Sequence, residues 1–402
     1  MPQSLFNVYL VLILLFFPGG ALGKTKCTDH FVRKEWRSLS REERKLWISG
    51  VKCLANTPSD GLFVPSVNPD DIAPYNTSGS LFDDIVYAHM DLNHRIHWTG
   101  LFFPWHRWYL HLFEKALRTR CGYPGAIPYW DWTQDAGNFY ESSFFKDSDP
   151  DSGLGGWGDA STGYRVLDGA FSASSSFQVS YPVPHTIRRN FTLFPSFPIP
   201  AVWNHTRPAN VTFTKSVVES LIDGFVGDFK GFNGYMEGID GPHLNVHFLM
   251  GGDVSGACPS DAPAGCQPGP TFAPNGQVSG APQLIFTYLS LDPLFFLHHA
   301  MVDRTWFKWQ QKHNNKYAFE GGSVQRLANA SEFALYPNGG PPYLSLESEI
   351  PTDGLSPGFV AEINDSPYLM MESEIPTDGL SSGFTVAEMM DTMEEPLCYV
   401  YD

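Results

Sequence analysis

Apolar and polar positions follow a helical period in several separate stretches of this chain. The pattern predicts helices over residues 31–56, 82–97, 106–120, 214–226, 243–250 and 294–313. In the first of these segments Ser40 precedes Glu43 by three positions, which is the pattern of a capping box at a helix start. We therefore expect most of the regular structure to be α-helical.

Two stretches between these helices carry no sustained period. Residues 133–212 are rich in Ser, Gly, Pro and Phe, and residues 251–283 are similarly irregular. Glycine and proline interrupt regular structure, so we expect long loops in both stretches. The sequence thus predicts a mainly α fold with long irregular loops and little β-structure.

Histidine is concentrated in two clusters within the predicted helices. The clusters are His89, His94, His97 and His106, and then His243, His247, His298 and His299. Imidazole is a good ligand for copper, zinc, iron and nickel. Neither cluster has a cysteine among its candidate ligands, which argues against zinc-finger and blue-copper sites. Two all-histidine clusters indicate instead a coupled dicopper centre that binds dioxygen.

The spacing of these histidines supports metal binding. His243 and His247 are four positions apart, so on a helix they share one face and can hold one ion. Asp303 follows His299 by the same interval, which would let its carboxylate orient that ligand. The His-Glu-x-x-His string of zincins is absent from the sequence. Any single histidine could be a hydrogen-bonded group in an aromatic core, but six at these spacings favour a metal centre.

The residues around both clusters resemble the type-3 copper proteins, the family of tyrosinases, catechol oxidases and molluscan-type haemocyanins. Residues 97–107 match the first-copper signature of that family, with Glu114 in place after it, and residues 292–303 match the second-copper signature. Residues 121–132 and the closing Tyr399-Val-Tyr401 add to the resemblance, which runs from about residue 27 to the end. The chain is most similar in character to the short secreted tyrosinase-like enzymes of filamentous fungi.

This resemblance implies two copper ions and a set of ligands. The first copper would be held by His89, His97 and His106, and the second by His243, His247 and His299. His94, His111 and His298 are then non-ligands, the last because the signature leaves three residues between the ligand and its Asp, here Asp303. The implied core is an antiparallel four-helix bundle that holds the dicopper site.

The activity implied is the oxidation of o-diphenols to o-quinones with dioxygen, with monophenols as possible further substrates. In the family a Glu ahead of the second-copper histidines can position a water base, often with an Asn after the first of them. Glu237 is the candidate catalytic residue, or alternatively a solvated loop carboxylate, and the substrate-binding candidate Leu244 replaces the Asn. We therefore expect weak or absent monophenol hydroxylation.

Three other functions remain open from the sequence. The first is a pathway-specific oxidase that acts on one phenolic intermediate of secondary metabolism. The second is a non-catalytic dioxygen-binding protein like haemocyanin, and the third is a copper site that only stabilises the fold. The oligomeric state is not predicted.

The N-terminus predicts secretion. Residues 1–23 resemble a signal peptide, with an apolar core over residues 10–17 and a small-x-small site before Lys24. We expect residues 24–402 to form a single copper domain without a membrane anchor. Six sequons favour N-glycosylation of an exported chain. They begin at Asn76, Asn190, Asn204, Asn210, Asn329 and Asn364.

Six cysteines follow the signal segment and suggest disulfides. Their fifteen possible pairings stay open, and Cys258 with Cys266 is the one local guess. In fungal members of the family a cysteine two residues before the second ligand of the first copper is bonded to it. Arg95 occupies that place, so we expect His97 to be unmodified.

The formal net charge of −17 argues against nucleic acid and anionic membranes as partners, and leaves a neutral phenol and dioxygen compatible. Fourteen Asp and Glu but no Lys or Arg follow Arg326. Residues 343–392 contain an acidic tandem repeat, in which residues 343–356 recur at 368–381. We interpret it as a duplication in a peripheral segment, or alternatively as an acidic flap across the mouth of the site.

Overall fold

The computed structural model describes residues 26–61, 63, 65, 73–97, 99–181, 183–194, 208–238, 240–254, 291–312, 315, 318–319 and 385–402. The mainly α prediction is confirmed for this part of the chain. Its helices are α1 (Arg41–Asn56), α2 (Leu81–Ile96), α3 (Phe102–Cys121), α4 (Lys215–Asp223), α5 (Phe229–Glu237), α6 (Pro242–Met250) and α7 (Leu294–Gln311). The signal segment, the two copies of the acidic repeat, and Cys258 with Cys266 lie outside the described residues.

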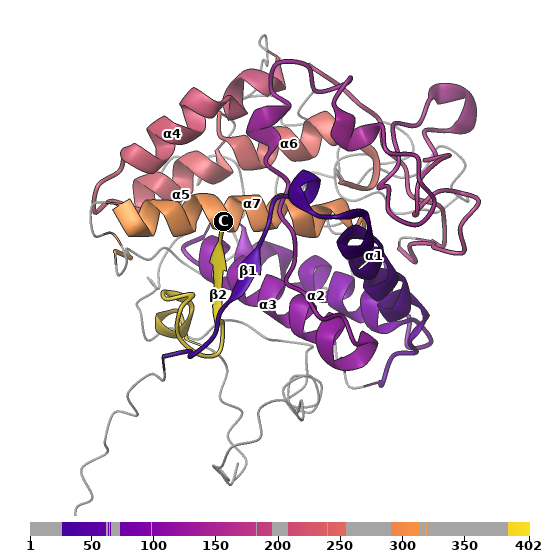
Figure 1. Ribbon diagram of the computed structural model, residues 1–402, viewed down its shortest axis with the longest axis horizontal. Coiled ribbons are helices and arrows are strands. Elements are labelled where there is room, and N and C mark those ends of the chain that lie inside the picture. The colour runs from indigo at the N-terminus through magenta and orange to yellow at the C-terminus, as the bar shows by residue number, and fades with distance from the viewer. Residues whose placement is uncertain are drawn as a thin grey trace, which may run out of the picture.

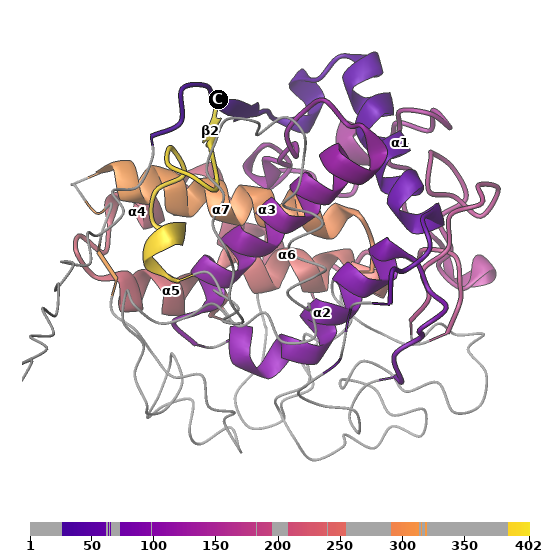
Figure 2. The same ribbon diagram turned by 90° about the horizontal axis from the view of Figure 1, so that it is seen from below.

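Helix α7 lies between two groups of helices, with α2 and α3 on one side and α4, α5 and α6 on the other (Figure 1). It contacts α3, α4 and α6 directly, while α3 also packs against α1 and α2. The view from below shows α3 crossing α7 (Figure 2). The clustered histidines belong to α7, to α3 and α6, which contact α7, and to α2, which packs against α3.

The capping box predicted at Ser40 is confirmed. The Ser40 side chain accepts from the backbone N–H of Glu43, and the Glu43 carboxylate accepts from the backbone N–H of Ser40. These two bonds satisfy free N–H groups at the start of α1. A second capping box, between Ser80 and Asp83, starts α2. Local sequence thus fixes where both helices begin.

The prediction of a helix over residues 31–40 is wrong. Residues Phe31–Arg33 form strand β1, which pairs in parallel with strand β2, Tyr399–Tyr401. A short 3-10 turn, Trp36–Ser38, then leads into α1. The partner strand is some 370 positions away, and such long-range pairing outweighs a local helical pattern.

Two further helices differ from the predictions, one in its first residue and one in its presence. Helix α3 begins at Phe102 rather than at residue 106, because Pro104 is tolerated in a first turn whose N–H groups have no helical partner. Helix α5 was not predicted at all, since its two glycines hide the pattern. Its signal was nevertheless present: Asp228 caps it, and Phe229, Phe232 and Met236 are buried at helical spacing.

The irregular stretch after α3 is folded against the helices by polar anchors, in agreement with the predicted loops. Arg189 pairs with Asp292 at 2.7 Å, and both side chains are fully buried. Asp292 also accepts from the backbone N–H of Leu294, so the same carboxylate caps the start of α7. Arg189 donates onward to the carbonyls of Leu154 and Gly155. The loop thereby fixes the N-terminal end of the helix that carries His299.

Two disulfides join segments that are distant in sequence. Cys27 bonds to Cys398, which ties the segment before β1 to the segment before β2. Cys53 bonds to Cys121 and joins the last turn of α1 to the end of α3. Within the described segments, no helix has the length and apolar character needed to cross a membrane.

A buried carboxylate, Asp303 of α7, connects four elements of the fold. Its Oδ1 accepts from Nε of Arg107 in α3 at 2.6 Å. Its Oδ2 accepts from the hydroxyls of Tyr399 and Tyr401 at 2.5 and 2.6 Å and from Arg33 of β1 at 3.3 Å. Because these groups are removed from water, each donor depends on this acceptor.

Glu114 of α3 completes the charge balance next to Asp303. It accepts from Arg33 at 3.1 Å and from Arg118 at 2.6 Å, as well as from the backbone N–H of Ile127. Burial alone would raise the pKa of Glu114, but the two guanidinium groups outweigh it and hold that pKa at about 2. The carboxylate is therefore ionised throughout the neutral range.

Asp303→Ala should destabilise the fold strongly, because it leaves Arg33 and Arg107 buried with one counter-charge fewer. Breaking a buried ion pair in this way typically costs about 3–5 kcal/mol. Asp151→Ala is the matched control, since Asp151 pairs with Lys45 at an exposed position and such pairs contribute about 1 kcal/mol or less. The free energy of unfolding from urea titration measures both changes. Equal losses in the two variants would contradict the role given to Asp303.

Candidate metal centre

The first histidine cluster is assembled from α2 and α3. His89 lies within α2, His97 is its C-terminal capping residue, and His106 lies in the second turn of α3. Nε2 of His89 is 3.4 Å from Nε2 of His106, and the ring of His97 lies 5.1 and 5.0 Å from the rings of His89 and His106. Each residue offers a ligand atom within 4.8 Å of the others.

The second cluster joins α6 to α7. His243 and His247 share one face of α6, as their spacing predicts, with ring centres 4.7 Å apart. Nε2 of His247 lies 3.2 Å from Nε2 of His299 in α7. His298 also belongs to this cluster by distance. The structure therefore brings together all six predicted ligand histidines, in one group of three and in one group of four that includes His298.

The two clusters face each other and form one site. The rings of His106 and His299 stack at 4.5 Å with an angle of 14°, and those of His97 and His243 lie 6.1 Å apart at 22°. Phenylalanine rings border both groups. Phe295 lies 4.0 Å from His299 and 4.9 Å from His89, and Phe102 lies 4.8 Å from both His106 and His243. Ions held by the two clusters would be neighbours in an apolar enclosure.

Backbone carbonyls orient three of these rings. Nδ1 of His106 lies 2.7 Å from the carbonyl of Phe102, and Nδ1 of His247 lies 2.9 Å from that of Val254. Nδ1 of His97 lies 3.2 Å from the carbonyl of Asn93. A carbonyl can only accept, so in these neutral rings Nδ1 carries the hydrogen and Nε2 keeps its lone pair. Each Nε2 is thereby prepared to bind a metal ion.

Burial disfavours the protonated form of most histidines of the site. Burial lowers the pKa of His106 and of His247 to about 3. Burial and the neighbouring imidazoles hold the pKa values of His89, His243 and His299 well below the usual value. Metal ions bind imidazole in its unprotonated form, so this environment favours binding at neutral pH.

These donors fit a pair of copper ions. All six side chains are imidazoles, between 0 and 4% exposed, and they form two sets of three. Imidazole nitrogen suits copper, and the described site offers neither a thiolate nor a carboxylate ligand. The pairs of facing Nε2 atoms at 3.4 and 3.2 Å are close enough to share a cation.

The expectation that Asp303 orients His299 is wrong. Asp303 is occupied by two arginines and two tyrosines, and Nδ1 of His299 has no hydrogen-bond partner among the described residues. The i, i+4 spacing does place both on α7, but the carboxylate points to the neighbouring network. Its contribution to the site is indirect, because Arg107 directly follows His106.

Glu237 and Leu244 both lie close to the second cluster in the chain and are both buried. Glu237 is the last residue of α5 and is 2% exposed, so the alternative of a solvated loop carboxylate is wrong. Its Oε2 accepts from Asn233, whose amide also lies 3.4 Å from the carbonyl of Thr99, two residues after His97. Leu244 follows His243 in α6 and is fully buried.

His111 and the described cysteines lie outside both histidine clusters. His111 lies in α3 but in neither cluster, and burial lowers its pKa to about 3. The side chains of His94 and Arg95 lie outside the described residues. All four described cysteines are in disulfides, so none of them is available to modify His97.

Sequence reasoning did not assign a role to two residues near the site. Trp132 donates from its indole nitrogen to Nδ1 of His298 at 3.1 Å. Asn233 holds Glu237 from one turn earlier in α5. The aromatic residues within 129–132 were a signal that could have pointed to Trp132. Asn233 had no such signal, because helix α5 was not predicted.

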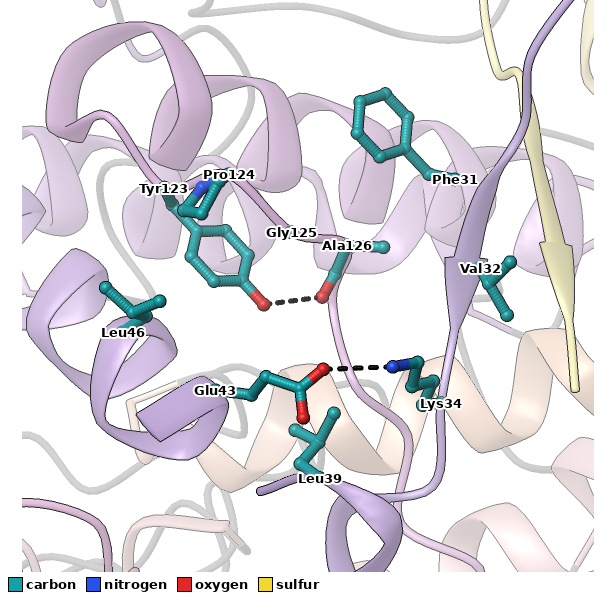
Figure 3. Close-up of a pocket in the computed structure, with 10 residues that line it drawn as sticks. All are labelled: Phe31, Val32, Lys34, Leu39, Glu43, Leu46, Tyr123, Pro124, Gly125 and Ala126. Carbon is teal, nitrogen blue, oxygen red and sulfur yellow. Dashed lines mark hydrogen bonds and ion pairs between the residues drawn. The ribbon is translucent and has the colours of Figure 1, made fainter. Parts of the chain in front are cut away.

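A separate pocket of about 310 Å³ lies on the surface beside β1 (Figure 3). Strand β1, the start of α1 and the turn after α3 surround it, with Lys34 and Glu43 paired at 2.9 Å and Tyr123 bonded to the carbonyl of Ala126. No histidine lines it, so it is distinct from the metal centre.

Comparisons with known proteins identify the family. A sequence profile described as the common central domain of tyrosinase matches residues 79–312. Tyrosinase-like protein phomQ1' of Diaporthe leptostromiformis is 31% identical over 305 residues, which cover 71% of this chain and 65% of that protein. N-acetyl-6-hydroxytryptophan oxidase ivoB of Emericella nidulans is 28% identical over 350 residues, covering 77% of this chain and 82% of that protein.

A solved structure agrees in fold. A variant of the polyphenol oxidase from Thermothelomyces thermophila superposes with a TM-score of 0.58 at 23% identity, covering 92% of this chain and 88% of that one. The chain spans 65 and 63% of the length of the two phomQ1 relatives that it matches, which is just under two thirds. With the family profile matched through both histidine clusters, this chain belongs to the tyrosinase family of type-3 copper proteins.

Proposed function

We propose that this protein is a dicopper oxidase that converts o-diphenols to o-quinones with dioxygen. The observation that carries the proposal is the buried site in which two clusters of imidazoles face each other. Membership of the tyrosinase family supports phenolic substrates. Two o-diphenols give four electrons and four protons to one dioxygen, which yields two quinones and two waters.

The histidines of the two clusters are the proposed ligands. The first copper would be held by His89, His97 and His106, and the second by His243, His247 and His299. The bound pair supplies the redox chemistry with dioxygen. The chain keeps the imidazoles neutral, fixes their orientation through Nδ1, and surrounds them with Phe102 and Phe295.

Glu237 is the proposed proton acceptor for a phenol, acting through a water. Its burial and its bond to Asn233 hold the carboxylate in one place, and Asn233 links it to the segment after His97. Leu244 directly follows His243 in α6 and is buried, and an amide at this position could help to hold such a water. Monophenols need this deprotonation most, so we propose that o-diphenols are the preferred substrates.

A second candidate is an oxidase for one particular phenolic compound. A relative that is 28% identical to this chain is named for a single hydroxylated substrate, N-acetyl-6-hydroxytryptophan. The copper site and the redox chemistry would be the same in both proposals. They differ in how many simple catechols the enzyme accepts.

We also propose that the protein is secreted and N-glycosylated. Two disulfides favour an oxidising compartment. Among the described sequons, Asn76 is exposed at the surface and could carry a glycan. The amide of Asn210 instead donates to the carbonyl of Ala136, and Thr212 of that sequon is buried. Asn76 is therefore the better acceptor.

The ligand assignment predicts opposite effects at two adjacent histidines. His299→Ala should remove the second-site copper and so halve the copper content, because it deletes one of three ligands. His298→Ala should keep most of the copper. Metal analysis of the purified proteins measures both, with circular dichroism as the control for folding. Loss of copper in His298→Ala but not in His299→Ala would reverse the assignment.

The reaction predicts oxygen consumption with simple catechols. The copper-loaded protein should take up one dioxygen for each two molecules of catechol oxidised, and tyrosine should react much more slowly. An oxygen electrode and quinone absorbance measure the two rates, and His299→Ala is the inactive control. Reaction with N-acetyl-6-hydroxytryptophan but not with catechol would favour the second candidate. Two bound coppers without any phenol oxidation would contradict both.

Leu244→Asn should raise the ratio of monophenol to diphenol turnover. A positioned base contributes about 10²–10⁴-fold to a proton transfer, so partial gain of its water should increase the ratio by about tenfold. Leu244→Ala is the matched control, because it removes the apolar side chain without adding an amide. Adding Glu237→Gln to the Asn variant should abolish the gain. An unchanged ratio, with copper content and diphenol rate preserved, would show that this position does not control hydroxylation.

A further inference from the structure

A fourth imidazole lies within the second histidine cluster. His298 is 1% exposed and offers a ligand atom within 4.8 Å of those of His243, His247 and His299. Its ring is nearly parallel to that of His243, 5.6 Å away at 11°, and edge-on to that of His247 at 4.5 Å. Distance and burial alone therefore do not distinguish His298 from its three neighbours.

The indole of Trp132 makes the distinguishing contact. Its Nε1–H donates to Nδ1 of His298 at 3.1 Å, and both residues are buried. An indole N–H can only donate, so Nδ1 of His298 is the acceptor and carries no hydrogen. A neutral imidazole has one ring hydrogen, which must then be on Nε2. In this form the Nε2 of His298 has no lone pair to offer to a metal ion.

The position of that indole is fixed by its own surroundings. Trp132 begins a 3-10 turn that Asp131 caps by accepting from the backbone N–H of Thr133. The carbonyl of Asp131 in turn accepts from Arg37 at 3.0 Å. The indole ring is fully buried and packs edge-on against Phe213 at 5.9 Å. The donor is therefore held by contacts outside the histidine clusters.

We propose that Trp132 excludes His298 from the copper coordination sphere by fixing its hydrogen on Nε2. His106 and His247 are held in the opposite tautomer, because their Nδ1–H groups face backbone carbonyls and their Nε2 atoms remain open. For His298, His106 and His247, the hydrogen-bond partner at Nδ1, rather than the distance to the metal, then decides whether Nε2 can be a ligand. Trp132 is thus a positioning residue, because it acts on the site only through the ring of His298. The inference rests on the proposed copper centre.

Histidine ¹⁵N chemical shifts in the apo-protein test the proposal, because they distinguish the two tautomers directly. His298 should be in the Nε2–H form, and His106 and His247 in the Nδ1–H form. The His298→Gln variant assigns the His298 signals by their absence. After anaerobic addition of diamagnetic cuprous ions, the Nε2–H signal of His298 should persist while Nε2 of His106 and His247 shifts.

Trp132→Phe removes the donor and keeps most of the buried ring. His298 should then populate both tautomers in the apo-protein and lose part of its Nε2–H signal when cuprous ions are added. Trp47→Phe is the matched control, because Trp47 is equally buried and its indole nitrogen has no described partner. That variant should leave the His298 signals unchanged.

A wild-type His298 in the Nδ1–H form would overturn the proposal, and this measurement needs no variant to fold. Loss of the Nε2–H signal on copper binding to the wild-type protein would overturn it as well. Failure of the wild-type protein to bind copper would instead contradict the proposed function, while the apo-protein spectrum would still report the tautomer. The two failures are therefore distinguishable.

Discussion

The buried carboxylate of Asp303 is the interaction on which the arrangement of the site most depends. It lies one turn after His299 in α7 and binds Arg107, the residue next to His106 in α3. The same carboxylate accepts from Arg33 in β1 and from both tyrosines of β2. It thus holds together the helices of the two histidine clusters and attaches both ends of the described chain to them. Because all partners are buried, no water can replace a lost bond.

Backbone carbonyls orient three of the six proposed ligand rings. Carbonyls at the far side of His97, His106 and His247 leave Nε2 open toward the centre. Burial keeps the rings of His106 and His247 neutral by lowering their pKa values to about 3. The fold therefore offers buried imidazole donors that suit copper.

The family match concerns the histidine clusters and the fold, and not the preference for a particular phenol. The family profile covers both histidine clusters, and the solved polyphenol oxidase shares the fold at 23% identity. Under the proposed function, preference among phenols would depend on residues beside these clusters. Glu237, held by Asn233, and Leu244, next in the chain after His243, are the candidates.

The sequence by itself predicted the two histidine clusters and most helices, because both signals are local. The i, i+4 spacing of His243 and His247 and the capping box at Ser40 act within one or two turns of helix. Only the tertiary structure decided that residues 31–33 form a strand, that Asp303 serves the buried network rather than His299, and that Trp132 contacts His298. Each of these depends on a partner that the fold brings from a distant part of the chain, and spacing along the sequence carries no information about such partners.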